Sequence, residues 1–317
     1  MKGPLFAFAL ALASAPLAFS WGAQGHAAIG LVAEQNLTAD SRRHVESLLG
    51  NDDLAAIASW MDDLRGAAKG FGKLAANPEA REFVKRFPQN TEWHYVDFPL
   101  GAGTYREDSP FARPDDVVHE IKVAIDVLEG HGTPGIPPRI ALYMLVHFVG
   151  DLHQPLHVAC GYYDLSSPEH PKLLTDPAQA RGQPDDQGAN LLHFGPERYD
   201  ELHAYWDSAL PRKVAHGGEP AKLAKVLMDA LPAAGAATPG DYHHWAEDWA
   251  TESIAAANQA YDGIVFGSAD VEDGRIRQIT ITLPANYDER MEPVAERRMA
   301  LAGYRLAALL NTIHWAN

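Results

Sequence analysis

The sequence contains one cysteine, Cys160, in 317 residues, so no disulfide can form within the chain. It also lacks basic runs: no stretch of Lys or Arg exceeds two residues, and 26 Lys and Arg stand against 42 Asp and Glu. This balance argues against a protein that grips duplex nucleic acid through a broad basic face. Beyond the first 20 residues, no apolar run is long enough to span a membrane.

The first 20 residues have the pattern of a secretory signal peptide. Lys2 precedes an apolar run over 5–12, and the small residues Ala18 and Ser20 predict cleavage before Trp21. The alternative, a short membrane anchor, would need a longer uninterrupted apolar stretch. We therefore expect a mature chain of residues 21–317 with a formal net charge of −17. Export without disulfides indicates a secreted or periplasmic bacterial protein.

The mature part is predicted to be mostly helical, because apolar residues recur at three- and four-residue spacing between Gly and Pro. The length alone would allow two domains, but we expect one, of the all-α class, a multi-helix bundle with long loops and at most short β segments. The expected short strands are Gln278–Leu283 and Trp93–Phe98. The expected helices cover residues 23–36, 40–49, 52–66, 114–129, 138–153, 199–209, 219–231, 242–261 and 288–312.

Two long irregular stretches, about 98–113 and 161–189, are rich in Gly, Pro, Asp and Ser. Long loops in a compact domain are often functional or held by a metal, although a disordered insertion is the alternative.

Histidine is abundant, with 15 residues, and several lie at short spacing from Asp. In a helix, His147 and Asp151 are four residues apart and project from one face, so both can reach one ion. His157 lies beyond Pro155, which ends or kinks the helix, and so points toward a second ion. Imidazole and carboxylate together suit zinc.

The same spacing recurs at His203 and Asp207, and isolated members of the pattern stand at Asp62 and His94. A single His-x-x-x-Asp pair is weak evidence, but two pairs and a histidine just past a helix-ending proline predict a site for several metal ions. His153 lies on another helix face and is left out. The remaining histidines lack such context and are expected to be surface or core residues: His44, His119, His131, His170, His193, His216, His243, His244 and His314.

These residues carry a resemblance to a known family. The chain resembles the three-zinc, single-strand-preferring nucleases that include 3'-nucleotidases and share the phospholipase C/nuclease fold. The resemblance covers the mature chain and rests on seven motifs in order. They are Trp21-Gly-x-x-Gly25-His26, Trp60-x-Asp62-x-x-Arg65, Trp93-His94-Tyr95-x-Asp97, the segment 147–157, Asp186-x-Gly188-x-Asn190, Leu202-His203-x-x-Trp206-Asp207 and the sequence from Leu301 to Ala307. Ala189 stands where the family usually has a second glycine.

The resemblance implies three Zn²⁺ ions. One would bind Asp62, His94, His147 and Asp151; a close neighbour would bind His26, shared Asp151, and the amino nitrogen and carbonyl oxygen of Trp21; a third would bind His157, His203 and Asp207. The amine of Trp21 exists only after cleavage. The alternative for Trp21 and His26 is a buried aromatic and a helix-surface histidine.

The reaction implied is hydrolysis of a phosphodiester by water activated between the close zinc ions, leaving the phosphate on the 5' side. Asp62 and Asp151 would serve catalysis as ligands, and Arg65 matches the family's transition-state arginine; the alternative is an ordinary salt bridge. Tyr95 and Asp97 match positions that stack a base and bind its edge, and the alternative is a core tyrosine and a capping aspartate. Asn190 could offer its amide to substrate or stabilise a turn.

The expected substrates are therefore single-stranded DNA and RNA and 3'-nucleotides, for a monomer without a stable protein partner. Zinc in the cleft of an acidic protein attracts phosphate while the rest of the surface gives a rigid duplex little help. Two rival interpretations are a zinc phospholipase C on the same fold and a non-catalytic zinc-binding protein. The first would need an apolar or cationic membrane face, and no basic amphipathic helix is evident.

Overall fold

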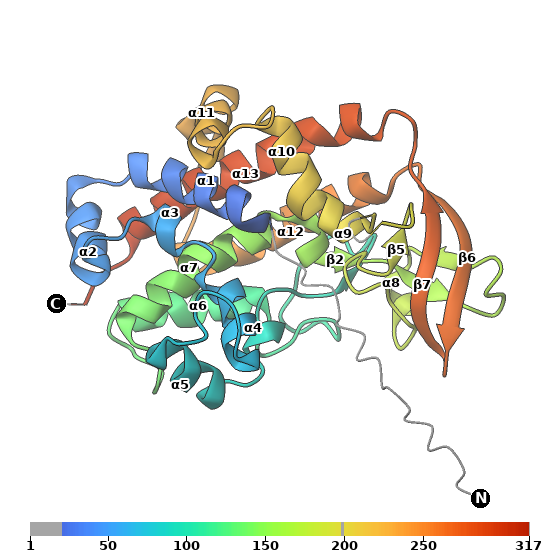
Figure 1. Cartoon of the computed structure of the whole chain (residues 1–317), viewed down its shortest axis with the longest axis horizontal. Helices are drawn as coiled ribbons and strands as arrows, with labels where there is room; N and C mark the ends of the chain where they lie inside the picture. The colour runs from blue at the N-terminus through green and yellow to red at the C-terminus, as the bar shows by residue number, and fades with distance from the viewer. Residues whose placement is uncertain (1–20, 198–199, 317) are drawn as a thin grey trace, which may run out of the picture.

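The computed structural model describes residues 21–197 and 200–316 of the chain. The expected signal peptide, residues 1–20, lies outside the described residues. Helices form the body of the molecule, and a β-hairpin projects at one edge (Figure 1).

Most of the described chain is helical. The α-helices are α1 (Gly22–Gln35), α2 (Ala39–Leu49), α3 (Leu54–Ile57), α4 (Trp60–Lys69), α5 (Pro78–Arg86), α6 (Val117–Leu128), α7 (Pro138–His153), α8 (Pro177–Ala180), α9 (Leu202–Ala204), α10 (Leu210–Val214), α11 (Pro220–Ala230), α12 (Trp245–Tyr261) and α13 (Tyr287–Thr312). Shorter turns of other types are η1 (Asn90–Glu92), η2 (Pro155–His157), η3 (Tyr205–Ala209), η4 (Ala233–Ala236) and η5 (Tyr242–His244).

The strands form three small sheets. β1 (Phe98–Pro99) pairs in parallel with β2 (Ala159–Cys160), and β3 (Tyr162–Asp164) pairs antiparallel with β4 (Lys172–Leu174). In the third sheet β7 (Arg275–Thr282) lies between β5 (Leu192–His193) and β6 (Val265–Glu272).

Helix α7 lies at the centre of the core. Every residue from Ile140 to His153 is buried, so this part of the helix has no solvent face, and the helix packs against α6, α12 and α13. Its apolar residues occupy all sides because neighbours surround it. The helix ends at Gln154, since Pro155 cannot continue it and disfavours a helical residue before it. Polar side chains buried near the end of α7 therefore need partners inside the protein.

The all-α prediction is confirmed, and most helices lie within a few residues of their expected bounds. Three local predictions are wrong. The segment 52–66 contains two helices, α3 and α4, and between them the carbonyl oxygen of Ala58 bonds His147 Nδ1 at 2.7 Å instead of continuing one helix. In 93–98 only Phe98 is in a strand. The segment 199–209 begins its helix at Leu202, and Tyr199 lies outside the described residues.

Helix α5 and strand β6 are among the elements that were not expected. Helix α5 begins at an Asn77 N-cap, and β6 forms a hairpin with β7 through Asp273 and Gly274, both with positive φ. The irregular stretch 161–189 contains β3, β4 and α8, and it packs against the stretch 98–113 through Tyr162 and Phe111, whose ring centroids are 5.5 Å apart. None of the described helices is both long enough and apolar enough to cross a membrane.

Candidate metal centre

Helix α7 and the turn that follows it supply residues to both parts of the candidate site. His147 and Asp151 lie one turn apart, with 3.3 Å between His147 Nε2 and Asp151 Oδ2, as their spacing predicts. The 3₁₀ turn after Pro155 then carries His157 away from the helix axis. The residues that follow α7 therefore face a different part of the site.

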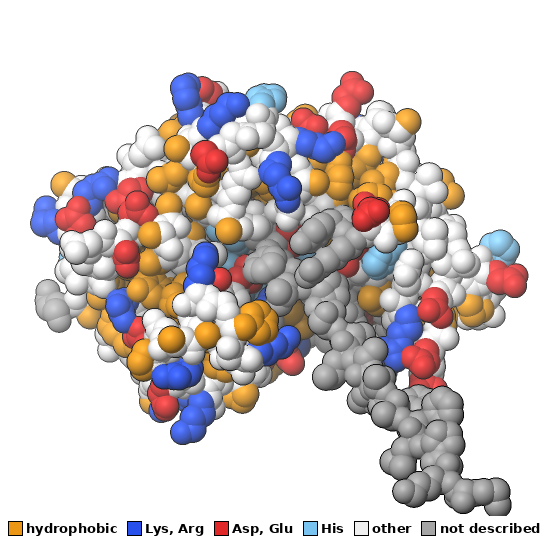
Figure 2. All heavy atoms as spheres, viewed as in Figure 1, with side chains coloured by type: hydrophobic (Ala, Val, Ile, Leu, Met, Phe, Trp, Pro, Cys, Tyr) orange, Lys and Arg blue, Asp and Glu red, His pale blue; other side chains and the backbone are white. Residues whose placement is uncertain are grey.

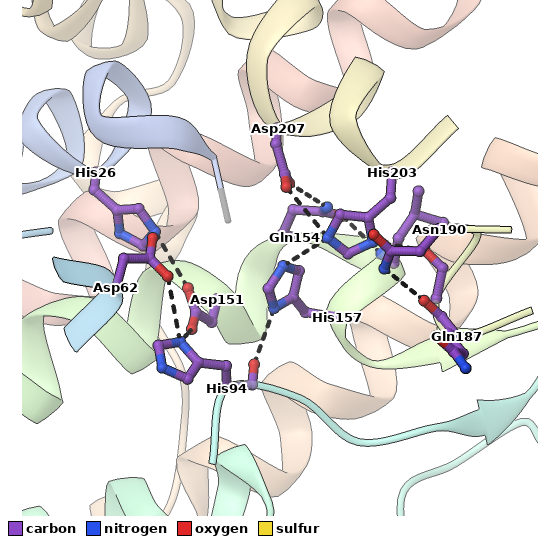
Figure 3. Close-up of polar contacts among 12 residues, drawn as sticks. His26, Asp62, His94, Asp151, Gln154, His157, Gln187, Asn190, His203 and Asp207 are labelled. Carbon is purple, nitrogen blue, oxygen red and sulfur yellow. Dashed lines mark hydrogen bonds and ion pairs between the residues drawn. The ribbon is translucent and has the colours of Figure 1, made fainter. Parts of the chain in front are cut away.

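Five residues form what we call the first cluster. His26 comes from α1, and its Nε2 lies 3.2 Å from Asp151 Oδ1. His94 Nδ1 lies 2.9 Å from Asp151 Oδ2, on the other oxygen of the same carboxylate. All members are buried, and Figure 3 shows His26, Asp62 and His94 converging on Asp151. The first cluster consists of His26, Asp62, His94, His147 and Asp151.

Three residues form the second cluster: His157, His203 and Asp207. His203 Nε2 lies 3.2 Å from Asp207 Oδ2 and 3.1 Å from His157 Nε2. The spacing of four residues is realised where α9 runs into the π-helical turn η3 rather than in a regular α-helix. The two clusters lie side by side in Figure 3.

Backbone pairing ties the clusters to each other. The chain at Val96 runs alongside the chain after α7, because Val96 N–H donates to the carbonyl of His157 at 2.8 Å. In return, His157 Nδ1 bonds the carbonyl oxygen of His94 at 2.9 Å. A ligand candidate of the first cluster thus helps to orient one of the second.

The ring contacts fix which nitrogens face inward. His157 Nδ1 bonds the His94 carbonyl, and His203 Nδ1 bonds the Gly188 carbonyl at 2.6 Å. When both rings are neutral, each Nε2 therefore carries a lone pair, and the two face each other at 3.1 Å. Two lone pairs at this distance repel unless a proton or a metal ion lies between them. Two nitrogens on one tetrahedral zinc are about 3.3 Å apart, so the pair fits that ion.

Several buried carboxylate oxygens also lack hydrogen bonds. Among the described residues, neither oxygen of Asp62 nor Oδ2 of Asp207 accepts one. Buried polar atoms without partners are costly, and buried carboxylates are paired or bind metals. The donor set of imidazoles and carboxylates therefore fits zinc in both clusters.

The electrostatics differ between the clusters. In the first cluster burial disfavours a charged His147, but Asp151 and Asp62 outweigh burial and raise its pKa to about 9. In the second, burial lowers the pKa of His157 to about 3. The first cluster therefore has an excess of negative charge that a proton or a metal ion can balance, whereas His157 stays neutral.

Trp21 lies at the start of α1 and is fully buried, with φ of 33°. Its carbonyl oxygen accepts a hydrogen bond from Gly25 N at 3.0 Å, and its ring lies 6.3 Å from that of Trp206, which precedes Asp207. A carbonyl oxygen has two lone pairs, so this bond leaves one for another partner.

Arg65 lies one turn after Asp62 on α4. Its Nη2 is 3.8 Å from Asp62 Oδ1, and its side chain is 17% exposed. It is therefore held beside the first cluster while still reaching solvent. The alternative interpretation of Arg65 was an ordinary salt bridge. Its pair with Asp62 is such a contact, near the upper limit of distance for an ion pair, and it does not exclude a contact with substrate.

A cavity of about 420 Å³ lies beside the second cluster. Its lining includes Arg65, Tyr95, Asp97, Asn190, His157 and His203. All three residues expected to bind substrate thus border the same space as two expected ligands.

Arg113 holds two of these residues. Its guanidinium lies 4.8 Å from the centroid of the Tyr95 ring and 3.7 Å from Asp97 Oδ2. Burial, with a contribution from Asp185, raises the pKa of Asp97 to about 7. Asp97 can therefore donate or accept a proton near neutral pH. Sequence reasoning missed Arg113, because nothing in its local pattern links it to Tyr95.

The side-chain amide nitrogen of Asn190 donates to the carbonyl oxygen of Gln187 at 2.7 Å, so Asn190 does stabilise its turn. Sequence reasoning also missed Gln154, which is fully buried and whose Nε2 donates to Asp207 Oδ1 at 2.8 Å. This bond leaves Oδ2 facing His203. The sequence did offer one signal for Gln154: it stands just before Pro155, at the end of a helix with two expected ligands.

The omission of His153 agrees with the structure. Its Nδ1 bonds the carbonyl of Val149 at 2.8 Å, and its Nε2 bonds Arg305 Nη1 at 3.1 Å. His153 thus faces a buried arginine on α13, away from both clusters.

Over the face shown in Figure 2, acidic and basic side chains are interspersed without a large basic field.

Comparison with known proteins gives one consistent result. The profile of the family described as S1/P1 Nuclease matches residues 21–314. The chain is 26% identical to Nuclease S1 of Aspergillus oryzae, with 98% of this chain and 96% of the relative covered. It is 27% identical to Nuclease P1 of Penicillium citrinum, covering 93% and 98%, and 24% identical to Endonuclease 1 of Arabidopsis thaliana, covering 96% and 90%.

Proposed function

We propose a specific activity for this chain, which belongs to the S1/P1 nuclease family: zinc-dependent hydrolysis of single-stranded DNA and RNA to 5'-phosphorylated products, together with 3'-nucleotidase activity. Family membership supports a nuclease that hydrolyses nucleic acid. The zinc requirement, the number of ions and the second activity are our proposals.

The convergence of eight side chains from distant segments of the chain into two clusters carries this proposal. The facing Nε2 atoms of His157 and His203 are its most specific element, because a metal ion between them would bind the lone pairs of two neutral rings. We assign three ions to the ligand sets that the resemblance implies. The first cluster would hold two with Trp21, sharing Asp151, and the second cluster would hold one.

Zinc bound there would lower the pKa of water and stabilise negative charge on phosphoryl oxygens. The protein residues do the rest. Asp151 keeps the imidazoles of the first cluster in place. Arg65, partly exposed beside Asp62, would meet the phosphate with its fixed positive charge. A guanidinium aimed at charge that develops during reaction accelerates the chemical step.

Substrate selection would fall to the cavity beside the second cluster. Tyr95 offers an aromatic face for a base, and Arg113 supports that ring from within hydrogen-bonding distance of the Tyr95 carbonyl, at 3.1 Å. Asp97 can pair with a base edge, and Asn190 lines the same cavity. Stacking is tolerant of sequence and requires an unpaired base, which favours single strands.

Secretion belongs to the same proposal. An α-amine has a pKa near 7.7–8.0 and can lose its proton to bind zinc, whereas an amide nitrogen does not do so readily. Cleavage before Trp21 would therefore complete the ligand set only in the exported chain.

A phospholipase C on the same fold is the second candidate. The large hydrophobic side chains exposed among residues 21–197 and 200–316 are Phe71 and Val265, which lie in different parts of the chain. Two separated residues do not make an apolar membrane face. This observation favours a nucleic-acid substrate.

The test is an assay of the chain beginning at Trp21 on single-stranded DNA, RNA, a 3'-nucleotide and phosphatidylcholine, with and without chelator. We expect hydrolysis of the first three, loss of activity in chelator and recovery with added zinc. Activity on phosphatidylcholine alone would identify a phospholipase, and activity that survives chelation would refute zinc dependence.

A further inference from the structure

One turn beside the candidate centre has an unusual backbone. Gln187, Gly188 and Ala189 are three consecutive residues with φ of 56°, 61° and 66°. Side-chain-bearing residues rarely adopt this left-handed conformation, and two of the three carry side chains. The surroundings must therefore hold the turn in place.

Asp186, which precedes the turn, fixes the turn through hydrogen bonds. It is fully buried, and its Oδ1 accepts hydrogen bonds from Ala189 N at 2.9 Å and Gly161 N at 3.1 Å. Its Oδ2 accepts from the hydroxyls of Tyr163 and Tyr261, both at 2.9 Å. One carboxylate thus fastens the turn to its own far end, to β3 and to α12.

The carbonyl groups of this turn accept hydrogen bonds from two site residues. The Gly188 carbonyl accepts the hydrogen bond from His203 Nδ1, and the Gln187 carbonyl accepts from the amide nitrogen of Asn190 (Figure 3). Gly188 also packs against the backbone after α7, since a Cβ there would lie 2.3 Å from the carbonyl oxygen of Leu156. The direction of both carbonyls depends on the left-handed turn.

We propose that Asp186 is a positioning residue: by clamping the 187–189 turn, it makes His203 Nε2 face His157 and Asp207 and aims Asn190 into the cavity. This inference rests on the proposed function for the role of the second cluster. It adds a residue that touches neither substrate nor metal and acts through the backbone carbonyls of Gln187 and Gly188.

The first variant is Asp186→Asn, which keeps the shape but replaces one acceptor oxygen with a donor facing existing donors. Competition with a chromophoric chelator then measures the affinity for each zinc. We expect at least about a tenfold loss of affinity for one ion, with the other two unchanged. Gln154→Ala, which removes a direct contact with Asp207, should weaken the same ion and serves as the benchmark.

The second variant, Tyr261→Phe, retains the carboxylate and removes one hydroxyl donor, so it should fold even if Asp186→Asn does not. We expect a smaller loss in the same direction. The matched control is Tyr105→Phe, because Tyr105 OH donates to Asp116, a buried carboxylate that caps α6. It should lower the melting temperature by a similar amount and leave all zinc affinities unchanged.

A readout on the zinc-free chain separates this inference from the proposed function. Nitrogen-15 shifts of the His203 ring should report a proton on Nδ1 in the wild type and a mixture of tautomers in the Asp186 and Tyr261 variants. Unchanged tautomers and unchanged zinc affinities would overturn the positioning role, as would a loss of all three zinc ions in proportion to stability. If the wild-type chain binds no zinc, the proposed function is refuted. The positioning role would still stand if the His203 tautomers differ between the wild type and the Asp186 and Tyr261 variants.

Discussion

Arg65 Nη2 lies 3.8 Å from Asp62 Oδ1, one helical turn along α4, so a fixed positive charge stands next to a carboxylate without closing a short ion pair with it. A guanidinium presents five N–H donors in a planar fork that matches the oxygens of a phosphate. At the rim of the first cluster, we propose that this fork contacts the phosphate of the substrate.

Replacing Arg65 should separate chemistry from metal binding. We expect Arg65→Ala to lower kcat by about 10²–10³-fold, the usual cost of losing one preorganised donor to transition-state charge, while zinc content stays the same. Arg65→Lys should recover only part of this loss, because an ammonium lacks the planar fork. Steady-state kinetics and elemental analysis measure both. A change confined to KM would show that Arg65 binds the ground state only.

Replacing Tyr95 should distinguish substrates with and without a base. Tyr95→Ala should reduce kcat/KM for nucleotide substrates by roughly 5- to 150-fold, which corresponds to about 1–3 kcal/mol of stacking. A small chromogenic phosphodiester without a base should be hydrolysed almost as before. Tyr95→Phe, which keeps the ring, is the control and should resemble the wild type. Equal losses on both substrates would identify Tyr95 as a structural residue.

The left-handed turn predicts a gain in stability at an exposed position. Gln187 has φ of 56° and is exposed, so Gln187→Gly removes Cβ strain that outweighs the added freedom of glycine when unfolded. We expect the free energy of unfolding to rise by roughly 0.5–1 kcal/mol. Gln179→Gly is the matched control: it is an exposed glutamine in the regular helix α8, and the change there should destabilise by a similar amount. Denaturant unfolding of both variants gives the comparison, and destabilisation by both would contradict the strain.

Glu120 predicts a pH dependence of stability far from the metal ligands in sequence. It is buried in α6, and burial raises its pKa from 4.5 to about 8, with Asp115 adding to the shift. Because the folded-state pKa is the higher one, the contribution to stability is present below about pH 4.5 and is lost as the pH rises through about 8. Glu120→Gln cannot ionise, so its stability relative to wild type should increase between pH 5 and 8, by roughly 1–3 kcal/mol. Asp126→Asn, an exposed change on the same helix, should show no such trend in thermal unfolding.

Local patterns in the sequence were enough for the helical class and for the ligand pairs. Spacing of four residues places His147 next to Asp151 whatever the rest of the chain does, and the proline after Gln154 ends α7. The resemblance supplied the grouping of distant residues that spacing cannot give. His26 and Asp151 are an example, since the contact depends on how α1 packs beside α7.

What could not be predicted depends on tertiary contacts. At the break between α3 and α4, the Ala58 carbonyl oxygen bonds the ring of His147, 89 residues away. From its local sequence Asp186 is an ordinary loop residue. Its role depends on a tertiary contact, the hydrogen bond that it accepts from Tyr261 on α12. The β6–β7 hairpin is a different case. The Asp273-Gly274 pair between two alternating runs is a strong hairpin signal, so this element could have been predicted.

The most direct test of the account is the zinc content of two purified chains that differ by one residue. Elemental analysis of the chain beginning at Trp21 should find three zinc ions per molecule. The same chain with one additional alanine before Trp21 should retain two and be slower by at least about a hundredfold, because it lacks the amine ligand. One zinc ion or none in an active chain beginning at Trp21 would contradict the three-ion site, and equal zinc and equal activity in the two chains would exclude Trp21 as a ligand.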